Sequence, residues 1–206
     1  MRDSCRTIDH GMEAGMASAY RWLNEPASWE GDDRDLLLKT DGDTDFWRET
    51  FYGFVRDSGH AYLRPVSGDF TASATIVGQY EQLYDQAGLM LRVDEQNWIK
   101  CGIEYTDGLI HFSVVVTRGV SDWSVIPLHA KAPSDPLEVR LTRHGHAVRV
   151  QFRFAEERWQ MARLCPFSSA EAEVGVTACS PERAGFEARF RGLTVGPPIA
   201  RSLHDD

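Results

Sequence analysis

Hydrophobic and polar residues alternate along most of this chain, most clearly over residues 85–123. Two alternating runs flank Asp107-Gly108, a dipeptide typical of the two-residue type I′ turns that join antiparallel strands. Because successive side chains of a strand point to opposite faces, this turn fixes the register and places Glu104 opposite His111. The pattern therefore predicts a central β-hairpin over residues 98–117.

The predicted register divides the side chains of the hairpin between two faces. The apolar face is expected to pack in a core and carries Ile99, Cys101, Ile103, Tyr105, Ile110, Phe112, Val114 and Val116. The mixed face carries Trp98, Lys100, Gly102, Glu104, His111, Ser113, Val115 and Thr117. The preceding strand, residues 86–93, adds Gln86, Gly88, Met90 and Arg92 to the mixed face. Glycine within a strand often marks close approach of a ligand or of another backbone, so this face is a candidate binding surface. A solvated sheet face, with Glu104 and His111 as an ordinary cross-strand pair, is the alternative.

Short alternating runs, separated by turn residues, continue on both sides of the hairpin. Further strands are predicted at 19–23, 36–40, 52–55, 60–66, 70–80, 137–143, 147–154, 158–165, 172–178 and 186–195. A dozen or so short strands without a convincing amphipathic helix are typical of an all-β sandwich or barrel. No repeat or linker divides the chain. We expect an N-terminal arm at 1–18, one β-sandwich domain at 19–196 and a C-terminal tail at 197–206.

Composition and charge narrow the class of protein. The 206 residues are 42% hydrophobic and 26% charged, as in ordinary globular proteins. A net charge of −9 without a basic cluster argues against nucleic acid and against a membrane surface as partners. The most basic stretch alternates with apolar positions and predicts a solvated strand face: Arg140, Arg143, Arg149, Arg153 and Arg158.

The sequence shows no targeting signal and no cofactor site. We find no signal peptide and no segment long enough to span a bilayer. The four cysteines are widely spaced, which favours neither a disulfide framework nor a zinc site, and we expect a cytoplasmic protein. Residues 41–47, D-G-D-T-D-F-W, begin like a calcium loop, but Phe46 and Tyr52 occupy the positions that require glycine and glutamate. We therefore predict a turn there, and no metal site.

Four motifs, in this order, resemble one protein family. They are T-D-F-W at 44–47, D-Q-A-G at 85–88, W-x-K-x-G-x-E at 98–104 and S-D-W at 121–123. They are similar to those of the regulation-of-enolase-like family of unknown function, over about residues 22–195. This resemblance implies a concanavalin A-like jelly-roll sandwich of the lectin/glucanase superfamily, with two antiparallel sheets, one of them concave. It also implies that the motif residues line the concave face: Asp45, Trp47, Asp85, Gln86, Trp98, Lys100, Glu104, Thr117, Ser121, Asp122 and Trp123. The hairpin register adds His111.

A ligand-binding module is the first of three functional hypotheses. A carbohydrate or a similar polar small molecule would stack on indoles and would hydrogen-bond to a few convergent polar groups. The indoles are Trp47, Trp98 and Trp123, and the polar groups are Gln86, Lys100, Glu104 and Asp122. Packing in a core is the alternative role for each indole.

The other two hypotheses are a glycoside hydrolase and a regulatory module. Hydrolysis requires two carboxyl groups, about 5 Å apart for retention or about 6.5–9.5 Å apart for inversion. The candidates are Glu104 with Asp85 or Asp122, although the E-x-D-x-x-E strand of hydrolases with this fold is absent. A regulatory module would contact another protein or a second copy of the chain. We rank ligand binding first and leave open whether the protein is an enzyme.

Overall fold

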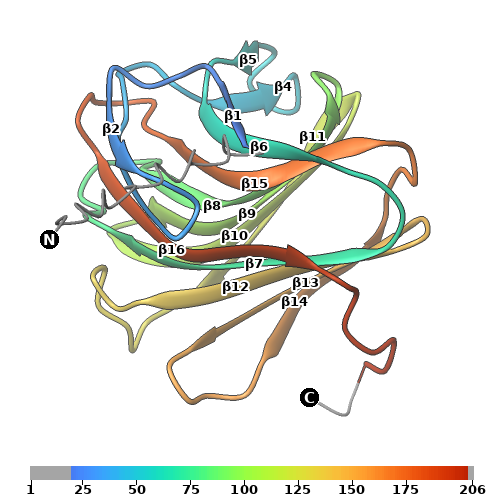
Figure 1. Ribbon diagram of the computed structural model, residues 1–206. Coiled ribbons are helices and arrows are strands. Elements are labelled where there is room, and N and C mark those ends of the chain that lie inside the picture. Colours follow the sequence, from blue (N-terminus) through green and yellow to red (C-terminus); the bar gives the residue numbers. More distant parts are fainter. Residues whose placement is uncertain (1–19, 204–206) are drawn as a thin grey trace, which may run out of the picture.

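Two antiparallel seven-stranded sheets stack on each other in the computed structural model, which describes residues 20–203 (Figure 1). The first sheet has the order β1-β6-β15-β8-β9-β10-β11. Its strands are β1 (Arg21–Leu23), β6 (His60–Val66), β15 (Ala172–Cys179), β8 (Gln86–Asp94), β9 (Asn97–Thr106), β10 (Leu109–Arg118) and β11 (Val120–Pro127).

The second sheet has the order β14-β13-β12-β7-β16-β3-β2. Its strands are β14 (Gln160–Pro166), β13 (Ala147–Phe154), β12 (Leu137–His144), β7 (Phe70–Gly78), β16 (Glu187–Gly196), β3 (Asp35–Lys39) and β2 (Ser28–Gly31). A separate hairpin pairs β4 (Phe46–Arg48) with β5 (Val55–Asp57). The expected sandwich is therefore confirmed. The predicted arm at 1–18 and the last three residues of the predicted tail lie outside the described range.

The central hairpin has the predicted register. Asp107 and Gly108 have positive φ angles of 53° and 78°, as a type I′ turn requires, and Glu104 lies opposite His111. The predicted apolar face of β9 and β10 packs between the two sheets. There Phe112 of β10 stacks on Phe152 of β13, with ring centroids 4.2 Å apart. This contact ties the two sheets together at the centre of the core.

The β4–β5 hairpin lies over the outer face of the first sheet, the face turned away from the second sheet (Figure 1). It buries a second apolar group there, which we call the outer cluster: Phe46, Trp47, Ala61, Leu63, Met90, Trp98, Val115 and Cys179. The chain passes close to Phe46 at Gly59, where an added Cβ would lie 2.3 Å from the phenyl ring. Only glycine fits at this contact, which lets the hairpin settle onto the sheet.

The mixed face of the central hairpin is buried, so the alternative of a solvated sheet face is wrong. Only 7% of the surface of Lys100 and 5% of that of Glu104 is exposed. Gly88 and Gly102 lie opposite each other on β8 and β9. An added Cβ on either would come within 2.2 Å of a carbonyl oxygen of the neighbouring strand. These glycines therefore allow close approach of two backbones.

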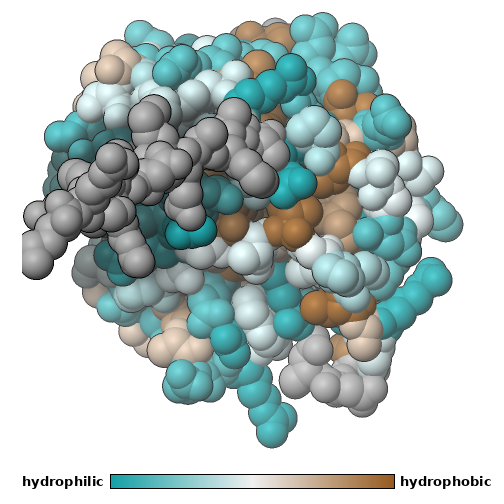
Figure 2. All heavy atoms as spheres, in the orientation of Figure 1, coloured by the Kyte–Doolittle hydropathy of each residue, from teal (hydrophilic) through white to brown (hydrophobic). Residues whose placement is uncertain are grey.

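Three strands were missed and one predicted strand is a loop. The missed strands are β2, β4 and β11. Residues 52–54, predicted as strand, instead belong to a loop, because positive φ angles at Phe51 and Gly53 interrupt the extended chain. On the side shown in Figure 2, hydrophilic residues cover most of the surface and hydrophobic residues form separate groups. Within residues 20–203, no helix is long and apolar enough to cross a membrane.

The predicted solvated face of arginines is wrong at two positions. Arg143 is fully buried and Arg149 is nearly so. Arg143 shares its face of β12 with Val139 and Leu141, which points it inward. It is tolerated at the rim of the sandwich because its guanidinium donates to the carbonyl oxygens of Gly68 (2.7 Å) and Ala170 (2.9 Å).

Candidate functional site

A pocket of about 160 Å³ opens on the outer face of the first sheet, beside the outer cluster. Its floor comes from strands β8 to β11, one wall comes from the β4–β5 hairpin and its loop, and the opposite rim comes from the segments before β8 and after β15. The lining residues are Asp45, Trp47, Tyr52, Phe54, Arg56, Tyr84, Gln86, Lys100, Glu104, Val115, Trp123, Pro181 and Glu182.

Hydrogen bonds from the β4–β5 hairpin to the edge strand β11 and to the turn before it hold this wall in place. The backbone N–H of Arg48 donates to Ser121 Oγ (2.9 Å), and Arg48 Nε donates to the carbonyl oxygen of Gly119 (2.9 Å). Ser121 is itself fixed by a hydroxyl contact with Thr117 of β10, at 2.9 Å. Thr117 and Ser121 therefore position the wall of the pocket.

The loop that joins β4 to β5 forms the outer part of this wall. It turns through positive φ angles at Glu49, Phe51 and Gly53, and the N–H of Glu49 donates to the carbonyl oxygen of Phe54 (2.7 Å). The fold of the loop places Tyr52 across the pocket from the segment before β8. The hydroxyl groups of Tyr52 and Tyr84 are 2.9 Å apart, which joins the two rims.

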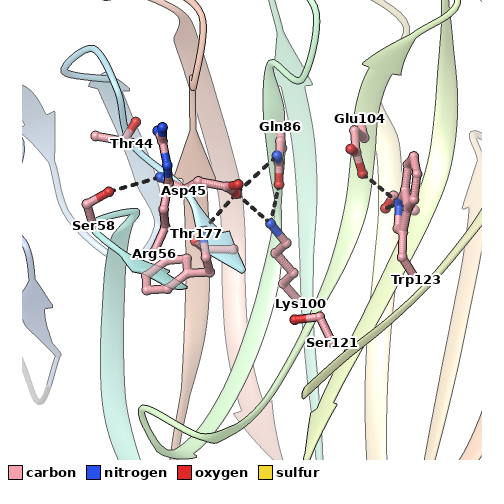
Figure 3. Close-up of polar contacts among 12 residues, drawn as sticks. Thr44, Asp45, Arg56, Ser58, Gln86, Lys100, Glu104, Ser121, Trp123 and Thr177 are labelled. Atoms are coloured by element: carbon pink, nitrogen blue, oxygen red, sulfur yellow. Dashed lines mark hydrogen bonds and ion pairs between the residues drawn. The ribbon is translucent and has the colours of Figure 1, made fainter. Parts of the chain in front are cut away.

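A buried ion pair occupies one side of the pocket (Figure 3). Lys100 Nζ of β9 donates to Asp45 Oδ1 at 2.9 Å and to Gln86 Oε1 at 2.7 Å. Burial is the largest single influence and lowers the pKa of Lys100, but the neighbouring Asp45, Cys179 and Glu104 together outweigh it and raise the Lys100 pKa above its ordinary value. The Asp45 oxygen also accepts the N–H of Phe46 at 2.8 Å, so the pair fixes the start of β4 to the sheet.

A buried carboxyl group occupies the other side (Figure 3). Trp123 Nε1 is 3.2 Å from Glu104 Oε2 and 3.0 Å from Ser113 Oγ, so one indole N–H faces two acceptors. Burial is the main reason that the pKa of Glu104 lies above its ordinary value. The positive charge of Lys100 and the hydrogen bonds from Ser113 and Trp123 oppose this rise only in part. Glu104 therefore carries a proton more readily than an ordinary glutamate.

Aromatic rings form the remaining surface of the pocket. The rings of Trp47 and Trp123 meet edge to face, with centroids 6.4 Å apart, and Tyr84 meets Trp123 in the same way. Tyr52 packs edge-on against Trp47 at 5.7 Å and stacks on Phe54 at 5.4 Å. The pocket thus joins apolar ring surfaces to a small set of fixed polar groups.

A family model described as "Protein of unknown function (DUF1349)" matches residues 22–198. The chain belongs to this family. Regulation of enolase protein 1 of Saccharomyces cerevisiae is 42% identical over 185 residues, which cover 89% of this chain and 92% of the yeast protein. The family resemblance inferred from the four motifs is confirmed.

Solved structures agree with the fold of this DUF1349 protein. A functionally unknown protein from Saccharomyces cerevisiae has a TM-score of 0.84 at 40% identity, over 88% of this chain and 98% of that chain. The GH43 BlXynB protein from Bacillus licheniformis has a TM-score of 0.64 at 18% identity, over 86% of this chain and 36% of that chain. At that identity the likeness shows the sandwich fold alone.

In this DUF1349 protein, some of the predicted site residues line the pocket. They are Asp45, Trp47, Gln86, Lys100, Glu104 and Trp123. Trp98 lies on the predicted face but is fully buried beneath the hairpin, with its ring 6.0 Å from that of Phe46. His111 is also buried outside the pocket, with Nδ1 3.2 Å from the carbonyl oxygen of Leu109.

The two carboxylates proposed as catalytic partners of Glu104 do not line the pocket. Asp85 is fully buried elsewhere, where Arg183 contacts both of its oxygens and Ser180 Oγ donates to Oδ1 at 2.8 Å. Asp122 pairs across the strands with Val116, whose side chain points into the sandwich core, and its carboxylate binds Arg163 of β14 at 2.6 Å. Asp85 and Asp122 therefore have other partners in this structure.

Seven further residues line the pocket that the sequence patterns do not predict as site residues: Tyr52, Phe54, Arg56, Tyr84, Val115, Pro181 and Glu182. The register did place Val115 on the mixed face. The aromatic run F-Y-G-F at 51–54 was a usable signal, because aromatic residues grouped around a glycine are typical of a loop that exposes rings. Arg56 and Glu182 gave no local signal. Among residues 20–203, no group of three or more His, Cys, Asp or Glu is arranged to hold a metal ion.

Proposed function

We propose that this pocket binds a small hydroxylated molecule, such as one sugar ring or a polyol. The main support for this proposal is that aromatic side chains and buried polar groups line the same pocket. Ligand pockets are typically concave and mostly apolar, with a few polar groups that set the orientation of the ligand. Here Trp47 and Trp123 supply flat apolar surfaces, and Gln86, Lys100 and Glu104 supply donors and acceptors beside them.

Burial of these polar groups supports binding over a purely structural role. Burying a lysine and a glutamate between the sheet and the hairpin that covers it costs free energy unless each side chain is paired. Lys100 has Asp45 and Gln86 as partners, whereas the N–H of Trp123 and the hydroxyl of Ser113 are the hydrogen-bond partners of the Glu104 carboxyl group within the described part of the chain. A carboxyl group has two oxygens that together accept about four hydrogen bonds. Glu104 thus keeps acceptor capacity for a hydroxyl group of a ligand.

The volume of the pocket limits the size of the ligand. Pockets that take drug-sized ligands measure about 300–1,000 Å³. A volume of about 160 Å³ suits one ring with its hydroxyl groups better than a chain of several rings. We therefore infer that the pocket takes a single small molecule or the end unit of a longer one.

Isothermal calorimetry and thermal shift test this proposal with D-glucose, D-galactose, D-mannose, D-xylose, myo-inositol and glycerol. A probe at a hundred times its dissociation constant stabilises the fold by about 2.7 kcal/mol. For a protein of this size that raises the unfolding midpoint by roughly 5–11 °C, at about 2–4 °C per kcal/mol. We expect at least one of the probes to bind.

Two variants in the same loop separate the pocket from the surface around it. Tyr52→Ala removes a wall of the pocket, so binding of that probe should weaken at least about tenfold. Phe51→Ala is the matched control, because Phe51 is 94% exposed and does not line this pocket. Equal losses in the two variants, or no binding of any probe, would contradict the proposal.

A further inference from the structure

Arg56 lines the pocket and makes few contacts of its own. It pairs across the hairpin with Trp47, so the two side chains leave the same face of the hairpin and both reach the pocket. Its guanidinium lies over the ring of Phe54, with Cζ 5.1 Å from the centroid. Among residues 20–203 its side chain makes one hydrogen bond, from Nη1 to the carbonyl oxygen of Asp43 at 3.4 Å, near the limit for such a bond.

Other arginines in the described part of the chain bind carboxylates with both arms of the guanidinium. Arg92 donates to both oxygens of Asp57 at 2.7 and 2.8 Å, and Asp57 directly follows Arg56 in β5. Arg189 binds Asp35 in the same two-pronged way. A guanidinium has five N–H donors in a planar fork that matches a carboxylate or a phosphate. Arg56 has this fork at the pocket, with no carboxylate of residues 20–203 in an ion pair with it.

The remaining charges of the pocket leave Arg56 as the cation open to a ligand. Lys100, the other cation of the pocket, is bound to Asp45 at 2.9 Å. Glu104 is held by Trp123 and Ser113 on the floor. Glu182 also lines the pocket, but it is exposed and no ion pair joins it to Arg56. One partly desolvated positive charge therefore faces the space that a ligand would fill.

We propose that the ligand of this pocket is acidic, and that its carboxylate or phosphate group binds the guanidinium of Arg56. The inference rests on the proposed function, since it names the chemical class of the molecule that the same pocket binds. The aromatic walls would hold the ring, and Arg56 would receive the anionic group at its edge. Phe54 restricts the guanidinium from one side, so the fork is oriented before the ligand arrives, which reduces the entropy lost on binding.

Matched pairs of sugars test the inference, because they differ only in the charged group. Calorimetry would compare D-glucose with D-glucuronate and with glucose 6-phosphate, and D-galactose with D-galacturonate, at constant ionic strength. We expect the acidic member of at least one pair to bind about tenfold tighter or more, as a charge-assisted hydrogen bond predicts. The carboxylate and phosphate probes then distinguish the two sources of the negative charge.

Three variants locate the effect. Arg56→Gln should abolish the preference for the acidic probe, so that the acidic and neutral members of a pair bind with similar affinity. Glu182→Gln should increase the preference by removing a nearby negative charge. Arg21→Gln makes the same change of charge at an exposed ion pair on β1, outside the pocket, and should change nothing. Thermal midpoints of all three variants confirm that they are folded.

The outcomes separate this inference from the proposed function. Equal binding of neutral and acidic sugars overturns the acidic ligand and leaves the proposed function standing. A preference that survives Arg56→Gln overturns the role of Arg56. No binding of any sugar overturns both. A preference lost in Arg56→Gln and kept in Arg21→Gln supports the inference.

Discussion

Replacing Lys100 by methionine tests whether the ion pair with Asp45 is truly removed from water. The side chains of Lys100 and Asp45 are only 9% and 13% exposed, and their charged atoms are 2.9 Å apart. Lys100→Met keeps the length of the side chain but leaves the Asp45 carboxylate buried without its counter-ion. Breaking a buried pair in this way costs about 3–5 kcal/mol. At about 2–4 °C per kcal/mol, the midpoint should fall by roughly 6–20 °C.

Urea unfolding followed by tryptophan fluorescence measures this cost. Stability falls linearly with the concentration of urea, so a lower midpoint with an unchanged slope gives the loss directly. The double variant Lys100→Met with Asp45→Asn should recover most of the loss, because no charge then remains buried. Lys39→Met is the control, since its ion pair with Glu187 is largely exposed and such pairs contribute little.

Two results would refute this reasoning. The first is a loss in Lys100→Met no larger than that in Lys39→Met, which would mean that water screens the pair. The second is a double variant whose loss equals the sum of the two single losses, because independent sites add and coupled sites do not. Either result would mean that the contact between Lys100 and Asp45 does not act as a coupled, desolvated ion pair.

Three more changes probe the framework of the site. Gly102→Ala should destabilise the protein by about 3 kcal/mol or more in urea unfolding, because its Cβ would lie 2.2 Å from a backbone oxygen, whereas Gly196→Ala, with open space around it, should cost little. Arg183→Gln strands a fully buried aspartate and should cost about 3–5 kcal/mol, against about 1 kcal/mol or less for Arg163→Gln at an exposed pair; similar losses would contradict this. Glu104→Gln should stabilise the fold, relative to the unchanged protein, increasingly as the pH rises. The raised pKa of Glu104 means that the folded state binds this proton more tightly than the unfolded state does. The stability that the bound proton contributes is therefore fully present below the glutamate pKa of the unfolded state and is lost as the pH rises through the pKa of the folded state. A thermal midpoint difference that does not change with pH would rule this out.

The central hairpin could be predicted from the sequence because its determinants are local. Asp107-Gly108 fixes the turn, and the alternation on either side fixes which side chains share a face. The observed register of β9 and β10 is the predicted one throughout. The same rule correctly placed Lys100 and Glu104 together on the face that carries the pocket.

The rest of the site depends on contacts between segments far apart in the chain. Trp98 has the right parity for the pocket, yet Phe46 of the β4–β5 hairpin covers it, and the sequence of that hairpin reads as a turn. The sequence around Asp85 gives no sign of a partner for its carboxylate. In the structure that partner is Arg183, which is 98 positions away in the chain. Arg56 joins the pocket only because the hairpin folds back over the sheet. Local patterns predict faces but not the segments that cover them.

The small size of the β4–β5 hairpin has a consequence for how molecules enter and leave the pocket. Three cross-strand pairs join β4 to β5, whereas ten join β9 to β10. Regions with few backbone hydrogen bonds open locally at a free energy below that of global unfolding. We therefore expect this wall, despite its side-chain anchors to the sheet, to open locally more often than the floor, so amide hydrogen exchange should be faster in residues 46–57 than in β9. A molecule bound in the pocket would slow that exchange. The exchange rate of residues 46–57 would therefore show whether the pocket is occupied.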